Sequence, residues 1–155
     1  MMAVAVALAT LTSWVDQDTP QSARTIASVH DSSTLELVFS DEFETEGRSF
    51  HDGEDPRWTA LRGKPSSNFQ VNYYNPDLAG TRNGCLELNM STTNITYPTF
   101  GGDGATAEAF FQSAFVESWN KVCIVGGGIV EMRARLPGPA TQAGLWPAFW
   151  LFGNL

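Results

Sequence analysis

The sequence predicts an antiparallel β-sandwich, and three features carry this prediction. Short segments of alternating apolar and polar residues recur along the chain, turn-forming residues separate them, and no segment has the periodicity of an amphipathic helix. The 155 residues include 14 Gly and 8 Pro, and 12% of the residues are aromatic. Only 17% are charged, below the usual share of about 25%. This composition excludes a helical bundle and a disordered tail.

The first half of the chain contains two predicted strands and a long loop. Residues 13–34 are polar and turn-like, and we expect a lead-in there. Residues 35–39 (LELVF) form the first predicted strand. Glycines and prolines recur through residues 44–68, which predicts a loop. Residues 71–74 form a second predicted strand, closed by the turn-forming residues 75–77.

The middle of the chain begins with a strong turn signal, the dipeptide Asn83-Gly84. Residues 85–90 then alternate between apolar and polar with a period of two, which predicts a half-buried strand. Residues 91–107 are rich in Gly and Thr and predict a loop. Residues 107–116 fit a helical turn or a strand equally well, and the sequence leaves that choice open.

Two further strands are predicted near the end of the chain. After three glycines, residues 130–136 alternate between apolar and charged side chains. Residues 145–152 (LWPAFWLF) are apolar on both faces, as an interior strand is. We expect the sandwich to be incomplete at its C-terminal side, because the chain stops three residues after this strand.

The charge and the cysteine pattern exclude several classes of function. The formal net charge is −8, which argues against a nucleic-acid partner, because phosphate-backbone binding needs clustered Lys and Arg. No Cys/His spacing is typical of a metal site, and no motif indicates a cofactor.

Three features point to the secretory pathway. Residues 1–15 carry no charge and are mostly apolar, but are too short to span a bilayer. They are either a signal peptide without its basic residues or a start that replaces a longer N-terminus. Two sequons, at Asn89 and Asn94, predict N-glycosylation. Cys85 and Cys123 could form one disulfide, or remain two thiols.

The last two predicted strands carry the residues best suited to sugar binding. A period of two places Glu131, Arg133 and Arg135 on one face of their strand, and Trp146 and Trp150 on one face of theirs. Aromatic rings stack on the apolar faces of sugars, while Arg and Glu bind hydroxyl groups. The alternative is an ordinary pair of strands, with Trp rings in the core and charges in solvent.

These strands also carry a resemblance. Residues 128–137 (GIVEMRARLP) and 144–151 (GLWPAFWL) resemble paired strands of glycoside hydrolase family 16, and residues 37–43 (LVFSDEF) resemble its first strand. Further pieces are similar to the fungal β-glucan synthesis-associated proteins, a cell-wall branch of that superfamily: residues 18–20 (DTP), 47–50 (GRSF), 55–56 (DP), 118–123 (SWNKVC) and 145–148 (LWPA). The pieces occur in collinear order from about residue 16 to residue 155.

The resemblance implies a concanavalin A-like jelly roll and a role in cell-wall β-1,6-glucan assembly. On this reading, residues 1–34 are an apolar start with a polar lead-in, and residues 35–155 are the N-terminal part of the domain. It also implies a β-glucan polysaccharide as partner and a membrane protein of the secretory pathway or cell surface, with an N-terminal anchor that is incomplete here. The residues that would line the sugar cleft are Glu131, Arg133, Trp146, Trp150, Asn68 and Tyr74.

One departure from the family leaves the activity open. Family 16 enzymes are retaining glycosidases or transglycosidases whose motif, Glu-x-Asp-x-x-Glu, supplies a nucleophile and a general acid/base. That motif does not occur in these 155 residues. The nearest lookalike, Glu42, Glu44 and Glu46, lies at the end of the first predicted strand, where we expect no catalytic role. The alternatives are therefore a partial glycosidase-type domain, a non-catalytic glucan-binding module and a non-functional fragment.

Overall fold

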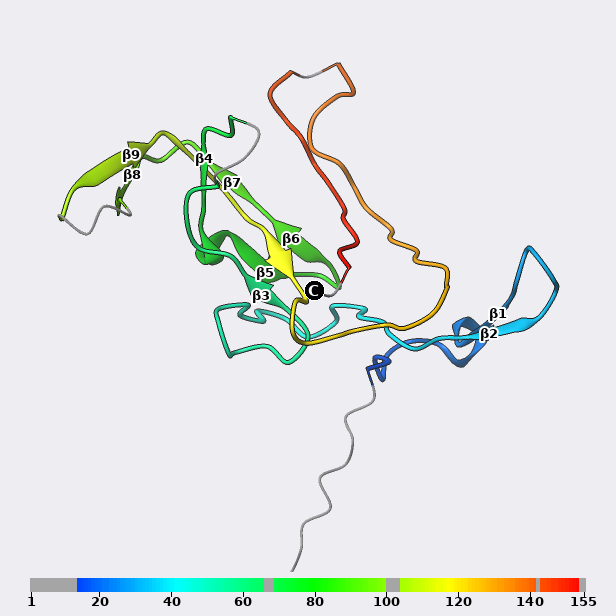
Figure 1. Ribbon diagram of the computed structural model, residues 1–155. Helices are drawn as coiled ribbons and strands as arrows, with labels where there is room; N and C mark the ends of the chain where they lie inside the picture. The colour runs from blue at the N-terminus through cyan, green and yellow to red at the C-terminus, as the bar shows by residue number, and fades with distance from the viewer. Residues whose placement is uncertain (1–13, 66–68, 100–103, 142, 154–155) are drawn as a thin grey trace, which may run out of the picture. The chain divides into compact units, whose positions relative to one another are not determined.

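The computed structural model describes residues 14–65, 69–99, 104–141 and 143–153 (Figure 1). The chain divides into two compact units, Met1–Val122 and Cys123–Leu155, which are described separately. Among the described residues, the only helices are short 3-10 turns, so the predicted all-β class is confirmed. No helix of this part is long and apolar enough to cross a membrane.

The strands and 3-10 turns of the described residues all lie in the first unit. In chain order they are η1 (Gln21–Ala23), β1 (Thr25–Ala27), β2 (Thr34–Glu36), β3 (Thr59–Ala60), β4 (Asn72–Tyr74), η2 (Pro76–Leu78), β5 (Ala79–Thr81), β6 (Leu86–Leu88), β7 (Met90–Ser91), β8 (Ile95–Pro98), β9 (Thr106–Ala109), β10 (Phe111–Ser113) and β11 (Val116–Glu117).

The strands form several small sheets, mostly antiparallel, which is consistent with a jelly-roll-like sandwich. Three pairs are hairpins of neighbouring strands, namely β1–β2, β5–β6 and β8–β9. Strand β3 pairs with the distant β11. Strand β10 lies between β7, to which it is antiparallel, and β4, to which it is parallel. The parallel pair is possible because the long crossover from β4 to β10 holds two of the hairpins.

The hairpin turn at Asn83-Gly84 forms as predicted. Both residues have positive φ, 51° and 67°, as a type I′ turn requires. The flanking residues Arg82 and Cys85 exchange backbone hydrogen bonds of 2.9 and 3.1 Å. This turn sets the register of β5 against β6.

The other strand predictions for the first unit are confirmed in part. Residues 71–74 contain β4, and residues 85–90 contain β6 and the start of β7. These two strands are separated at Asn89, whose N–H donates to the Leu78 carbonyl and whose carbonyl accepts from the Ala114 N–H. Residues 107–116, which the sequence left open, contain most of β9, all of β10 and the start of β11, and no helix.

The first predicted strand was placed too far along the chain. Residues 37–39 are not in a strand, and β2 ends at Glu36. After Leu37, whose N–H donates to the Arg24 carbonyl, the backbone bonds to side chains. The Glu42 N–H, for example, donates to the Asp16 carboxylate at 3.0 Å. In this segment, side-chain oxygens accept the backbone hydrogen bonds that a neighbouring strand would otherwise accept.

The strands predicted in the second unit were wrong. Among its described residues, neither residues 130–136 nor residues 145–152 form a hydrogen-bonded strand, and their side chains are largely exposed. Alternation specifies which side chains share a face, but a strand also needs a neighbour to receive its N–H and C=O groups. The described part of this unit supplies no such neighbour.

The core of the first unit is small. Its buried apolar side chains among the described residues are Phe50, Ala60, Tyr73 and Ala109. The ring of Tyr73 packs against that of Tyr97 at 5.1 Å, so β4 and β8 share this core. Because the apolar core is small, polar contacts carry much of the organisation of the unit.

Candidate functional site

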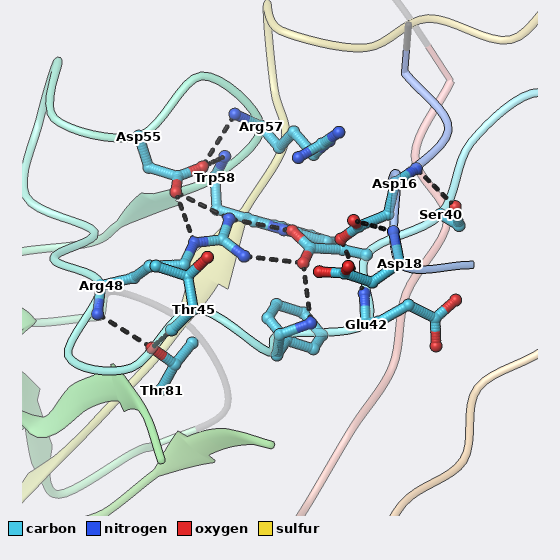
Figure 2. A network of polar contacts seen from close by, with 12 residues as sticks. Asp16, Asp18, Ser40, Glu42, Thr45, Arg48, Asp55, Arg57, Trp58 and Thr81 are labelled. Carbon is cyan, nitrogen blue, oxygen red and sulfur yellow. Dashed lines mark hydrogen bonds and ion pairs between the residues drawn. The ribbon is translucent and has the colours of Figure 1, made fainter. Parts of the chain in front are cut away.

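Two groups of side chains stand out in the first unit: a buried polar network and an accessible sheet face. The network centres on Arg48 (Figure 2). Its guanidinium donates to both oxygens of Asp41, at 2.6 and 2.9 Å, and to Oδ2 of Asp55, at 3.0 and 2.7 Å. The rings of Phe43 and Phe50 lie 5.5 and 5.2 Å from the guanidinium carbon. We call these residues, with Trp58 and Lys121, the Arg48 hub.

Asp55 shapes the turn that positions the hub. Its Oδ1 accepts the backbone N–H groups of Arg57 and Trp58 at 2.8 and 2.9 Å, an Asx-type turn. The Trp58 indole N–H then donates to Asp41 at 2.8 Å. Lys121 completes the hub from far along the chain, because its ammonium donates to the carbonyls of Asp55 and Trp58.

A second set of hydrogen bonds joins the lead-in to the segment before the hub. The Thr19 hydroxyl contacts Ser40 Oγ and donates to Glu42 Oε1, both at 2.7 Å. The backbone N–H groups of Asp16 and Glu42 donate to Ser40 Oγ and to Asp16 Oδ2. Burial raises the pKa of the Asp16 carboxyl, but the N–H groups of Asp18 and Glu42, together with the charges of Arg57 and Arg48, lower it more, so this pKa lies below its ordinary value.

The hub is a structural element. Arg48, Asp41 and Asp55 satisfy one another, and the Asp41 and Asp55 side chains are almost completely buried. Several motif pieces that carry the resemblance contribute residues to the hub, namely 37–43, 47–50, 55–56 and 118–123, and residues 18–20 bond to the adjoining segment through Thr19. The Glu42, Glu44 and Glu46 lookalike borders it, with Glu42 accepting from Thr19 and Glu46 from the Asn83 N–H. A closed network of this kind holds a fold and leaves no group free for a ligand.

The accessible face lies on β4, β7 and β10, and it contains the predicted site residue Tyr74. Paired residues of neighbouring strands share a face, and the register pairs Asn72 with Phe111, and Ser113 with both Tyr74 and Met90. The opposite side of these strands carries the buried Tyr73 and Gln112. We call the accessible side the Tyr74 face; its residues are Gln70, Asn72, Tyr74, Met90, Phe111, Ser113 and Phe115.

Contacts within the Tyr74 face hold its polar and aromatic groups in place. The Tyr74 hydroxyl donates to Gln70 Oε1 at 2.8 Å, and Asn72 Nδ2 donates to Ser113 Oγ at 2.8 Å. The rings of Tyr74 and Phe115 lie 5.2 Å apart. Lys64 donates to the carbonyls of Gln70 and Asn72 at 2.6 and 3.0 Å, and burial lowers the pKa of its ammonium.

The Tyr74 face offers aromatic rings beside amides and hydroxyls. Phe111 and Met90 are 48% and 57% exposed, and Tyr74, Asn72 and Ser113 are half-buried. Of these residues the sequence singled out only Tyr74. A period of two would place Phe111, Ser113 and Phe115 on one side of a strand, but whether residues 107–116 form a helix or a strand was left open by the sequence.

The other predicted sugar-binding residues lie outside the strands of this face. Asn68 lies outside the described residues. Glu131, Arg133, Trp146 and Trp150 belong to the second unit, where all four are exposed. Trp150 stacks near Phe152, with ring centroids 6.2 Å apart. Their role in sugar binding stays a prediction.

The predicted modification sites also stay predictions. Asn89 and Asn94 are both exposed, as glycosylation requires. Cys85 and Cys123 are both exposed and belong to different units. Within the described ranges, no cluster of three or more His, Cys, Asp or Glu side chains could hold a metal ion.

Comparison with known proteins identifies relatives along nearly the whole chain. The family described as "Beta-glucan synthesis-associated protein SKN1/KRE6/Sbg1" matches residues 2–155. "Beta-glucan synthesis-associated protein KRE6" of Saccharomyces cerevisiae is 42% identical over 144 residues, 93% of this chain and 18% of that protein. The SKN1 protein of the same yeast is 40% identical over 144 residues, 93% of this chain and 17% of that protein. KRE6 of Candida albicans is 38% identical over 141 residues, 91% of this chain and 17% of that protein.

The extent of these matches defines what they show. The chain spans less than a fifth of the length of these relatives. No solved structure matches it. The family match nevertheless covers almost every residue, including the hub and the Tyr74 face. The chain therefore belongs to the SKN1/KRE6/Sbg1 family of β-glucan synthesis-associated proteins.

Proposed function

We propose that this chain is a β-glucan-binding part of a cell-wall glucan synthesis protein, and that the Tyr74 face is where it binds. The observation that supports this most directly is the Tyr74–Phe115 ring pair on an accessible sheet face, beside Asn72 and Ser113. Family membership indicates β-glucan as the polysaccharide, because the relatives are named for β-glucan synthesis.

The chemistry of a β-glucan fits this face. A pyranose ring presents C–H groups on its flat sides, which pack on aromatic rings, and hydroxyl groups at its edge, which need amide, hydroxyl or carboxylate partners. Tyr74, Phe111 and Phe115 supply the rings, and Asn72, Gln70 and Ser113 supply the polar partners. An open sheet face also suits a linear polymer better than a closed pocket would.

The same proposal places the chain in the secretory pathway or at the cell surface, where cell-wall glucan is handled. Membrane association, which the family resemblance implies, is part of the same proposal. The exposed sequons at Asn89 and Asn94 support this location.

Glycosidase or transglycosidase activity, of the retaining family 16 type, belongs in this proposal to the whole protein. The Glu-x-Asp-x-x-Glu motif is absent from these 155 residues. The part described here would therefore bind the glucan without cleaving it. We expect the 155-residue chain to release no reducing sugar from β-1,3- or β-1,6-glucan.

Binding to soluble glucan tests the proposal. The chain, secreted from insect cells, is titrated with laminarin and pustulan, and with mannan as a control polymer. Tyr74→Ala should weaken glucan binding about 5- to 30-fold, since losing an aromatic contact costs roughly 1–2 kcal/mol. Phe110→Ala is the matched control, because Phe110 is an exposed aromatic outside the Tyr74 face.

Three outcomes would contradict the proposal. The wild-type chain could fail to bind either glucan, which would favour the non-functional alternative. It could bind mannan equally well. The Tyr74 and Phe110 variants could lose affinity equally, in which case the binding surface lies elsewhere, with the Trp146 and Trp150 side chains as the next candidates.

A further inference from the structure

The Tyr74 face continues along β11 to a carboxylate, Glu117. Val116 pairs with Ala60 and Glu117 with Thr59. Ala60 is buried, so Val116 and Ala60 point to the core and Glu117 points to the opposite side. Phe115, the residue before β11, continues this pairing, because its carbonyl accepts from the Leu61 N–H. Alternation therefore places its side chain on the same side as Glu117, and its ring lies 5.2 Å from that of Tyr74. Glu117 is therefore next to the aromatic pair, about 6.6 Å along the strand from Phe115.

The Glu117 carboxylate has no partner of its own in the part of the chain that the structure describes. The ion pairs found there use other acids, namely Asp41, Asp55, Asp77 and Glu87. Glu117 is half-buried, and burial raises the pKa of its carboxyl above the ordinary value. An unpaired, partly desolvated carboxylate costs stability. A binding role would explain its position.

We infer that Glu117 makes the Tyr74 face selective for neutral polysaccharides over acidic ones. An ionised carboxylate only accepts hydrogen bonds. A neutral glucan offers hydroxyl donors at every residue, and these can take up the acceptor capacity that no protein group uses. An acidic polysaccharide brings carboxylates or phosphates, which the Glu117 charge repels at close range in a partly dehydrated site. The inference rests on the proposed glucan binding at this face.

A pair of ligands that differ only in charge tests this selectivity. The probes are a β-1,3-glucan oligosaccharide and its carboxymethylated derivative of the same length, titrated at pH 7.5 in moderate salt. The wild-type chain should bind the neutral form at least about 10-fold tighter. Glu117→Gln removes the charge at nearly constant shape, and it should reduce this ratio about 3- to 10-fold, mainly by strengthening binding of the acidic form.

Two control variants separate a local effect from the general negative charge. Glu36→Gln removes one charge from β2, where Glu36 is exposed, and should leave the ratio unchanged. Glu117→Asp keeps the charge and should keep most of the selectivity. Thermal melts of all variants establish that they fold, and Glu117→Gln should melt at the wild-type temperature or above, because it removes a desolvated charge.

The inference is overturned if Glu117→Gln leaves the ratio unchanged, or changes it only as much as Glu36→Gln does. Its failure is distinguishable from failure of the proposed function. Loss of binding in Tyr74→Ala, together with an unchanged ratio in Glu117→Gln, would refute only the role of Glu117. A wild-type chain that binds neither ligand would refute the glucan-binding face itself, and the selectivity with it.

Discussion

Replacing Arg48 by Met should be among the most destabilising single changes in the first unit. Arg48 donates four hydrogen bonds to Asp41 and Asp55. The side chains of these acids are only 1% and 5% exposed. Burial lowers the pKa of Arg48, but the hydrogen bonds and charges of the two aspartates raise it more, so it stays charged. Met fills a similar volume and leaves both carboxylates without a counter-charge.

The cost can be estimated from what remains around the two acids. Breaking a buried ion pair by removing one partner costs about 3–5 kcal/mol. Asp41 keeps the Trp58 indole N–H, and Asp55 keeps the backbone N–H groups of its turn, which reduces the penalty. Loss of the cation–π contacts with Phe43 and Phe50 adds roughly 1 kcal/mol. We expect a loss of about 3–4 kcal/mol in the free energy of unfolding.

Arg82 offers a matched control, because it also binds one carboxylate with a fork of hydrogen bonds. It contacts Glu87 at 2.8 to 3.1 Å, but the two side chains are 65% and 32% exposed. Arg82→Met should therefore cost less than about 1 kcal/mol. Urea unfolding followed by tryptophan fluorescence measures both variants, and Trp58 in the hub is a direct reporter.

Similar losses in the free energy of unfolding for Arg48→Met and Arg82→Met would refute the reasoning. If Arg48→Met cost under 1 kcal/mol, water would have to reach Asp41 and Asp55, and the hub would not be a closed network. Arg48→Lys tests separately how much the planar guanidinium contributes beyond its charge. It keeps the positive charge without the planar fork, so its stability should lie between those of the wild type and Arg48→Met.

Two further predictions concern acid stability and glycosylation. The pKa of Asp16 is lowered in the folded state, so the ionised carboxylate stabilises the fold above its unfolded-state pKa, and this stabilisation is lost as the pH falls through its folded-state pKa. Asp16→Asn should therefore flatten the fall in melting temperature between about pH 5 and pH 2. An unchanged acid profile would count against the role of Asp16 in joining the lead-in to Glu42. Asn94, which lies between β7 and β8 in a polar loop, should be the main glycan acceptor after passage through a eukaryotic secretory pathway. If the mass shift on N-glycosidase treatment persisted in Asn94→Gln and disappeared in Asn89→Gln, the glycan would instead be on Asn89.

The sequence predicted best the features that are encoded locally. The all-β class followed from repeated short alternations and turn residues. The hairpin at Asn83-Gly84 followed from two residues that tolerate positive φ. The strands around residues 71–74 and 85–90 followed from short runs with clear turn signals beside them. In each case the residues from which the turn or strand was predicted are the same residues that form it.

Features that depend on distant partners were not predictable in the same way. The alternation over residues 130–136 was as clear as any in the chain, yet no strand forms there among the described residues. The parallel pairing of β4 with β10 joins two distant segments, and nothing in the sequence of either one indicates the other as its partner. Motif residues such as Arg48 and Asp55 were recognised, but their role was visible only once the folded chain placed them together. The Tyr74 face was missed for the same reason.

The position of Lys121 has a consequence for how the chain folds during synthesis. Its two hydrogen bonds join residues 66 and 63 positions apart in the sequence, and such non-local contacts slow folding. At a synthesis rate of about 5–20 residues per second, Lys121 follows Asp55 by roughly 3–13 seconds. During that interval the Asp55 turn has been made but its last partner has not. The hub therefore stays incomplete until residue 121 emerges, and during this interval its segments, although already made, can open to chaperones or misfold.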